Sequence, residues 1–259
     1  MPARGYPPPI VIPSPATGRA LCEEIAEIAL AELDIATQYA GFSTIGEQAA
    51  QFSADPAWGP FSIGHPNFMR MRVIGNYYTA IFRKFGDLYQ RVTETVIMRT
   101  LGLGEADLKY AFDISVDGGS QRRSLDIAII PDRVADPSAR ERVTKFLSRI
   151  NRAPTATAVL EVRACYMIGD SKRIQADEHA ANSARRAGLM PVMLIYCTTS
   201  LRSPVDRLRR SWFLFEGQDT FDFVRSLTGF DLSACLNSHK ARFRPAIDRV
   251  IKPFGIVLD

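Results

Sequence analysis

The stretches Ser124-Leu-Asp126-Ile-Ala-Ile-Ile130 and Ala158-Val-Leu-Glu161-Val-Arg163-Ala-Cys165 decide the fold of this chain. Both are short, apolar runs with the composition of β-strands. Alternate residues of a strand share a face, so Glu161 and Arg163 are expected to point the same way. If Asp126 lies beside them, two carboxylates and a cation meet at one place. That combination is typical of a site for a divalent metal and a phosphate.

Further elements surround these two stretches. A strand over 109–116 and a strand over 123–130 are predicted to form a hairpin, because Asp117-Gly118-Gly119-Ser120 is a strong turn signal. Pattern and capping residues predict the remaining elements of this region: helix 137–150, strand 157–165, helix 172–187, strand 190–197, strand 212–215, helix 219–227 and a mostly helical tail over 230–259.

Helical patterns dominate the N-terminal third of the chain. Helices are predicted over 16–40, 67–82 and 87–100, with 43–66 irregular and Gly86 separating the last two helices. We therefore expect residues 1–84 to form an arm and helices, and residues 85–259 to form a core with C-terminal helices. The expected fold class is α/β, with a mixed central sheet flanked by helices and an N-terminal helical extension. No linker divides the chain, so we expect one continuous domain.

The composition of the chain limits the classes of function that it can have. The 259 residues are 46% hydrophobic, enough for a sizeable core. No apolar run approaches the ~18 residues of a membrane span. The net charge of +4 is mildly basic, and only six of the 32 basic residues are lysines. Arginine pairs well with phosphate and guanine edges, although a GC-rich genome would explain the same bias.

The four cysteines, Cys22, Cys165, Cys197 and Cys235, are far apart in the sequence. No Cys-x-x-Cys pair indicates zinc. Cys165 and Cys197 fall in predicted strands and are expected to be buried thiols. Free thiols are typical of a reducing cytoplasm, which is the expected location.

The element order, with Asp126 on the second strand and Glu161-x-Arg163 on the third, resembles the PD-(D/E)xK nuclease superfamily. The chain looks most like a type II restriction endonuclease. The resemblance covers residues 85–197 and extends more loosely to about residue 232. It implies a restriction-endonuclease-like fold and Mg²⁺-dependent hydrolysis of double-stranded DNA.

The resemblance also implies roles for single residues. Asp126 and Glu161 would be the metal ligands, and Arg163 would occupy the position of the family's lysine. Arginine is too basic to act as a general base. It can still neutralise charge that develops on the attacked phosphate, and we assign it that electrostatic role.

A second version of the site involves the helix after the third strand. Its beginning resembles restriction enzymes that cut CCGG-type sites, in which an acid on this helix replaces the acid of the third strand. Glu178 would then be the second metal ligand, and Lys172 would stabilise the phosphate. The sequence leaves the choice between Glu161 and Glu178 open. It also leaves open a purely structural salt bridge between Glu161 and Arg163.

Two groups of arginines are candidate DNA contacts. Arg122 and Arg123 flank the hairpin turn, and four more arginines follow the last apolar strand. These four are Arg202, Arg207, Arg209 and Arg210. Short donors precede them, as is common at DNA contacts, although a solvated basic helix would look the same.

The sequence thus predicts a Mg²⁺-dependent type II restriction endonuclease acting on double-stranded DNA. Cutting both strands of a palindromic site favours a homodimer, with the N-terminal helices as a candidate dimer surface. Three alternatives remain. One is a DNA-binding protein that kept the nuclease fold but lost catalysis, and another is a monomeric repair or nicking nuclease. The third is an unrelated α/β enzyme in which Glu161 and Arg163 form a structural pair.

Overall fold

The structure, a computed structural model, describes residues 15–34, 45–61, 64–116, 119–151, 157–167 and 171–251. The chain divides into two compact units. Unit 1 comprises residues 1–28 and 89–238, and unit 2 comprises residues 29–88 and 239–259. Among the described residues, none of the helices combines the length and hydropathy needed to cross a bilayer.

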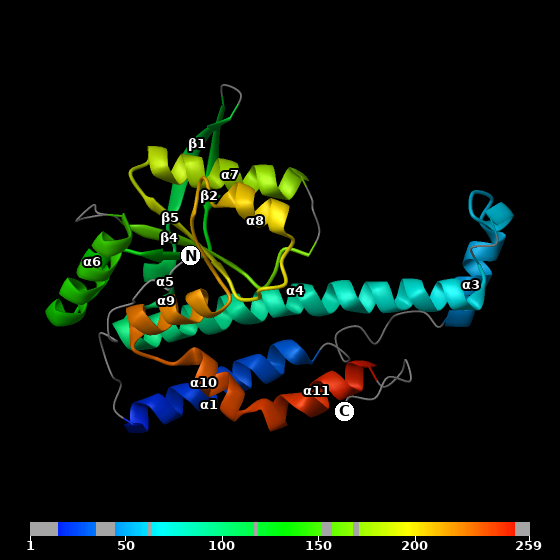
Figure 1. Cartoon of the computed structure of the whole chain (residues 1–259), viewed down its shortest axis with the longest axis horizontal. Helices are drawn as coiled ribbons and strands as arrows, with labels where there is room; N and C mark the ends of the chain where they lie inside the picture. Colours follow the sequence, from blue (N-terminus) through cyan, green and yellow to red (C-terminus); the bar gives the residue numbers. More distant parts are fainter. Residues whose placement is uncertain are drawn as a thin grey trace. The chain divides into compact units, whose positions relative to one another are not determined.

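Unit 1 is built on a four-stranded mixed sheet with strand order β3-β4-β5-β6 (Figure 1). The strands are β3 (Ile127–Ile129), β4 (Ala158–Arg163), β5 (Met190–Ile195) and β6 (Phe213–Glu216). β3 is antiparallel to β4, whereas β4, β5 and β6 run parallel. All six residues of β5 are buried, as expected for a central strand that is covered on both faces. The expected mixed α/β class is confirmed at this level.

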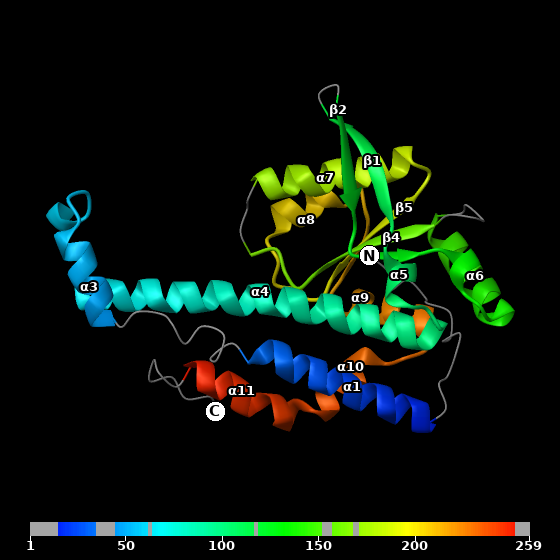
Figure 2. The ribbon, with the colours of Figure 1, turned by 180° about the vertical axis from the view of Figure 1, so that it is seen from behind.

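Helices cover both faces of the sheet. α7 (Ser171–Arg186) connects β4 to β5, and α8 (Arg202–Leu208) connects β5 to β6. Their apolar residues pack with Val159, Met193 and Leu214 in one buried cluster. The other face carries α6 (Pro137–Asn151) and α9 (Gln218–Thr228), which meet through the rings of Phe146 and Phe223, with centroids 5.2 Å apart. Figure 2 shows these layers from behind.

A separate two-stranded hairpin precedes the sheet. β1 (Ala111–Val116) pairs with β2 (Gly119–Ser124) in antiparallel register. The expected strand over 123–130 is wrong, because its residues divide between β2 and β3. The division falls at Leu125 and Asp126. Aspartate is disfavoured inside strands, and the Asp126 carboxylate accepts the backbone N–H of Val162 at 2.8 Å.

Unit 1 also contains part of two long helices and several short ones. Residues 15–28 of α1 (Pro15–Leu33) join α10 (Leu232–Ser238) through a disulfide between Cys22 and Cys235. Residues 89–101 of α4 (Pro66–Leu101) contact α1 through an ion pair between Arg99 and Glu24. The distance from Nη2 of Arg99 to Oε1 of Glu24 is 2.7 Å. The short helices are η2 (Pro131–Arg133) and α5 (Glu105–Leu108).

Unit 2 contains the first part of α4 together with α3 (Ile45–Ala54), η1 (Gly59–Phe61) and α11 (Lys240–Ile251). α3 contacts α4 where the Arg72 guanidinium lies 4.2 Å from the centre of the Phe52 ring. Lys84 forms an ion pair with Glu32 of α1 at 3.1 Å.

The N-terminal helices differ from the prediction in two places. α4 is one continuous helix, so the predicted break at Gly86 is wrong. Glycine costs a helix only about 1 kcal/mol relative to alanine, and burial of Leu88 and Val92 just beyond it offsets that cost. The stretch predicted as irregular contains α3 and η1. The first helix ends at Leu33, and residues 35–40 lie outside the described part.

Candidate functional site

The pairing of β3 with β4 brings the expected site residues together. Ile127 pairs with Leu160, and the next step of the antiparallel register sets Asp126 opposite Glu161. Glu161 and Arg163 alternate with Val159, which packs in the cluster beneath α7. The side chains of Asp126, Glu161 and Arg163 therefore gather on the α7 side of the sheet.

The Arg163 guanidinium occupies the centre of this cluster. It forms an ion pair with Glu161, and its Nη1 lies 3.8 Å from Oδ2 of Asp126. Nη1 also donates to the carbonyl of Val162 at 3.1 Å. Nε of Arg163, in contrast, is buried and has no hydrogen-bond partner. A buried donor without a partner is uncommon in folded proteins.

α7 adds a third acid that the sequence analysis did not select. Asp177 is buried, and its Oδ1 lies 3.4 Å from Nη2 of Arg163. Its other oxygen accepts the hydroxyl of Tyr166. Trp212 Nε1 donates to the Asp177 backbone carbonyl at 3.1 Å, which fixes this turn of the helix. Asp177 is thus the acid of α7 that lies in the cluster, the position at which Glu178 was expected.

The electrostatics of the cluster reflect crowded, buried acids. Burial raises the pKa of Glu161 to about 8 against the attraction of Arg163, and Asp126 and Asp177 add to the rise. Burial also raises the pKa of Asp126, although the Val162 N–H and Arg163 counteract it. Burial lowers the pKa of Arg163, but the neighbouring acids outweigh that effect and raise it. The arginine therefore stays charged.

The donor set fits a hard divalent cation in type and charge. Three carboxylates facing one guanidinium leave a formal charge of −2 when all are ionised, and oxygen donors are those that Mg²⁺ prefers. The oxygens of Asp126, Glu161 and Asp177 do not all lie within 4.8 Å of one another. A cation held by Asp126 and Glu161 would therefore take the place that the Arg163 guanidinium occupies here.

Glu94 and Lys109 lie at the edge of the cluster. Their side chains form an ion pair at 3.5 Å, and both charges act on Asp126. Gln90 donates to Glu94 at 3.1 Å. This pair therefore places two further charges near the cluster. Among the interactions described, neither residue of the pair contacts Arg163.

The two other expected site residues, both on α7, lie elsewhere. Glu178 accepts both Nε and Nη2 of Arg207, at 3.2 Å and 2.6 Å, and so joins α7 to α8. Lys172 is exposed in the first turn of α7. Of the charged residues on this helix, it is Asp177 that contacts Arg163.

The structure places the candidate DNA contacts in two settings. Arg122 is exposed on β2, whereas the side chain of Arg123 lies outside the described part. Arg202 and Arg209 both pair with Glu216, the latter with Nη2 3.1 Å from Oε2. Arg210 is exposed, and no ion pair of its side chain is found within the described residues. Much of the positive charge predicted to contact DNA is therefore balanced within the chain.

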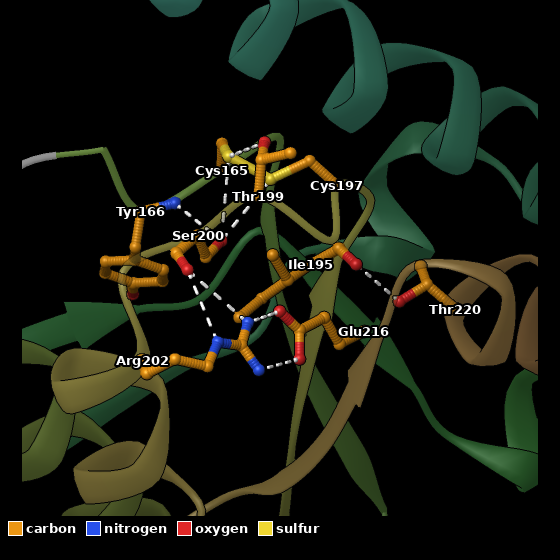
Figure 3. The surroundings of a disulfide bond; sticks show 9 residues. All are labelled: Cys165, Tyr166, Ile195, Cys197, Thr199, Ser200, Arg202, Glu216 and Thr220. Carbon is orange, nitrogen blue, oxygen red and sulfur yellow. Dashed lines mark hydrogen bonds and ion pairs between the residues drawn. A yellow bond between two sulfur atoms is a disulfide. The ribbon is translucent and has the colours of Figure 1, made fainter.

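The cysteine expectation is wrong. Cys165 and Cys197 form a disulfide that joins the residues just after β4 and β5 (Figure 3). Arg163 pairs with Ile195 in the parallel register, so two further residues along each chain bring the cysteines opposite each other. Together with the bond between Cys22 and Cys235, this leaves no free cysteine. Strand register, which the sequence alone did not provide, would have predicted the pair.

The disulfide lies in a tightly bonded loop. Ser200 Oγ accepts the N–H of Tyr166 at 3.0 Å, and Arg202 donates to the Ser200 carbonyl (Figure 3). Gly217 has φ 59° and an added Cβ would lie 2.3 Å from Thr198, so this position requires glycine. The loop after β5 is consequently held close to the end of β4, two residues from Arg163.

Comparison of the chain with protein-family models, curated proteins and solved structures found no match.

Proposed function

We propose that this protein is a Mg²⁺-dependent endonuclease that hydrolyses phosphodiester bonds in double-stranded DNA at a short specific site. The proposal includes a restriction-endonuclease-like fold, as in type II enzymes of the PD-(D/E)xK superfamily. One observation carries it. Asp126, immediately before β3, meets Glu161 and Arg163 of the adjacent strand β4 on one face of the sheet.

Asp126 and Glu161 are the residues that would hold the metal. When bound, Mg²⁺ would supply an activated water and neutralise charge at the phosphate. The Val162 N–H fixes one oxygen of Asp126, and burial in the sheet fixes the backbone of Glu161. Both carboxylates are thus oriented before any ligand arrives, which is what precise positioning of a cation requires.

Arg163 would move from the acids to the substrate. If Asp126 and Glu161 held a metal, the Arg163 guanidinium would no longer be needed to balance their charge, and its fork of donors fits a phosphate. The buried Nε–H, which lacks a partner here, could then donate to a phosphate oxygen. The arginine would stabilise the negative charge of the transition state without accepting a proton.

Asp177 and Tyr166 would position Arg163. The hydroxyl of Tyr166 donates to Asp177, and burial together with Asp177 raises the pKa of Tyr166. The phenol therefore remains a donor and holds Asp177 in place. Asp177 in turn keeps one side of the guanidinium directed toward the cluster.

The proposal extends to partners and location. Double-stranded DNA would contact Arg122 and Arg210, two exposed arginines among those that the sequence predicts to bind it. Cutting both strands favours a homodimer with one site per strand. A DNA substrate would place the enzyme in the cytoplasm. Disulfides are uncommon there, so the two disulfides of the structure are the observation that argues against this location.

A DNA-binding protein without catalysis is the second candidate function. The observation that favours it is Arg163 itself, because a permanent cation among the acids can replace the metal. Such a protein would bind DNA without cutting it. A monomeric nicking enzyme would share the chemistry proposed above but open only one strand.

The test is cleavage of phage DNA by the purified chain with Mg²⁺. Discrete fragments are expected, and they should be lost with EDTA or in Asp126→Asn. Glu105→Gln, which changes an exposed acid on α5, serves as the matched control and should cut normally. DNA that is bound but stays intact, even in Arg163→Lys, would favour the second candidate.

A further inference from the structure

The first half of α4 carries an exposed apolar stripe within unit 2 (α4, Figure 1). Phe68 and Tyr78 are each nearly half exposed, and Met71 is 69% exposed. Tyr78 also contacts Phe82 on the next turn, with ring centroids 4.5 Å apart. Large apolar side chains rarely cluster on a surface without a partner.

The stripe follows the spacing of a helix–helix seam. Its members recur at alternating intervals of three and four residues, which is the heptad pattern of coiled coils. They are Phe68, Met71, Gly75, Tyr78 and Phe82.

The opposite side of the same helix is already packed. Met69, Ala80 and Leu88 are buried there. A helix that is apolar on two opposite sides requires a cover on both. The stripe is therefore the side that awaits a partner.

Gly75 lies at the middle of the stripe. It is exposed, and a Cβ added there would meet nothing within 4 Å. Packing within the chain thus does not require glycine, although glycine costs a helix about 1 kcal/mol relative to alanine. A second helix crossing at this point would use the glycine, because a missing side chain lets two backbones approach closely.

The exposed area is close to what a stable dimer needs. Four large apolar residues of this half of α4 are 42–69% exposed: Phe68, Met71, Ile74 and Tyr78. With about 200 Å² per side chain, they expose roughly 400 Å², and apolar atoms contribute roughly 450 Å² of the ~800 Å² that each partner buries in a specific interface.

We propose that this face binds the same face of a second copy of the chain, with the two α4 helices antiparallel and crossing at Gly75. Phe68 and Phe82 each lie seven residues from Gly75, so a two-fold axis there sets Phe68 of one copy against Phe82 of the other. The same axis sets Arg72 against Tyr78 rather than against another arginine. The seam is thus self-complementary, as an isologous interface must be.

Charge argues against DNA as the occupant of this face. Residues 56–86 contain four basic residues and no acid, but two of these bases already have partners in unit 2. Arg72 stacks on Phe52, and Lys84 pairs with Glu32. The centre of the stripe carries methionine, glycine and aromatic residues, which a phosphate backbone does not bind.

The inference does not depend on the proposed catalysis, so the test uses the full chain without DNA or metal. Sedimentation velocity at tens of micromolar should give twice the mass of one chain. Met71→Arg and Tyr78→Arg should give single chains. Asn76→Arg, an exposed position of α4 away from the stripe, should stay dimeric. Circular dichroism and Tm verify that each variant is folded.

A cysteine at the crossing point tests the geometry. Gly75→Cys should form a disulfide between two copies on a non-reducing gel, whereas Asn76→Cys should not. A dimer that persists in Met71→Arg would overturn the proposal. A monomeric wild-type chain would also overturn it, and loss of DNA binding in Met71→Arg would then assign this face to nucleic acid.

Discussion

Arg163 is the residue on which this account depends. Its guanidinium contacts three carboxylates, of which Glu161 and Asp177 are buried, and each of its terminal nitrogens contacts an acid. A lysine at this position would present a single point charge, whereas the arginine fork spans several acids at once. In the proposed enzyme, the same property would suit it to a phosphate, with Asp126 and Glu161 holding the metal.

Replacing Arg163 should expose the repulsion among the acids. Arg163→Met leaves them without a cation, and we expect the free energy of unfolding to fall by about 3–5 kcal/mol at pH 8. The loss should be smaller at pH 5, where the acids bind protons. Arg163→Lys keeps a charge and should lose less. Urea unfolding of the three proteins at both pH values measures this, and equal stability of Arg163→Met and wild type would contradict it.

Glu161 should make stability depend on pH in a definite direction. Burial raises the pKa of Glu161 from 4.5 to about 8. Between those values the folded protein holds a proton that the unfolded chain has released, so the free energy of unfolding falls as the pH rises. Glu161→Gln cannot ionise and should avoid this loss.

The measurement is Tm against pH in EDTA. Glu161→Gln should match wild type near pH 5 and exceed it by pH 9. Glu105→Gln, the exposed control, should follow wild type throughout. Parallel curves for Glu161→Gln and wild type would contradict the prediction, because ionisation of Glu161 would then leave the free energy of unfolding unchanged.

The sequence predicted that Asp126, Glu161 and Arg163 lie together, but it did not select Asp177, and the reason is geometric. Asp126, Glu161 and Arg163 were predictable because strand alternation and pairing are regular. Asp177 was not, because it is adjacent to Glu178 on one helix, and residues one apart point about 100° apart. The choice between them depends on how α7 rotates over the sheet, which only packing determines.

At the scale of elements, the disulfide between Cys165 and Cys197 joins two central strands beside the site. It closes a loop with a sequence separation of 32 residues. A cross-link over such a loop restricts the unfolded chain and is worth about 3–4 kcal/mol in the loop-entropy model. Because it follows Arg163 by two residues, it also fixes the end of the strand that carries the cluster.

We expect reduction to weaken unit 1 through this bond. Cys165→Ser combined with Cys197→Ser should lower the urea midpoint under oxidising conditions. The Cys22→Ser, Cys235→Ser variant retains only the central bond. Its urea midpoint, compared with that of wild type in dithiothreitol, measures the contribution of this bond. Identical midpoints for oxidised wild type and the Cys165→Ser, Cys197→Ser variant would contradict this role.

Element boundaries were predictable where local signals and packing agree. Asp136-Pro137 and Gly188 mark ends of α6 and α7 that lie within a residue or two of the prediction. Gly86 misled because a single glycine is a weak signal inside a long packed helix. Asp126 interrupted an apolar run because its carboxylate bonds to the backbone of β4 instead of continuing a strand.

At the scale of the whole molecule, the features behind the two proposals lie in different units. Unit 1 contains the sheet, the acid cluster and both disulfides. Unit 2 contains the exposed apolar stripe of α4. The nuclease proposal therefore rests on unit 1 and the dimer proposal on unit 2. Each can fail without the other, and a monomeric chain that nicks DNA would separate them.

The most direct test of the central claim is Mg²⁺-dependent cleavage of supercoiled plasmid carrying a mapped site, with acids replaced one at a time. Asp126→Asn and Glu161→Gln should each abolish cutting while DNA binding persists. Glu178→Gln, whose carboxylate binds Arg207 instead of the cluster, should retain most activity. Full activity in Glu161→Gln together with loss in Glu178→Gln would contradict the cluster as the catalytic centre, and no cleavage by wild type would contradict the nuclease itself.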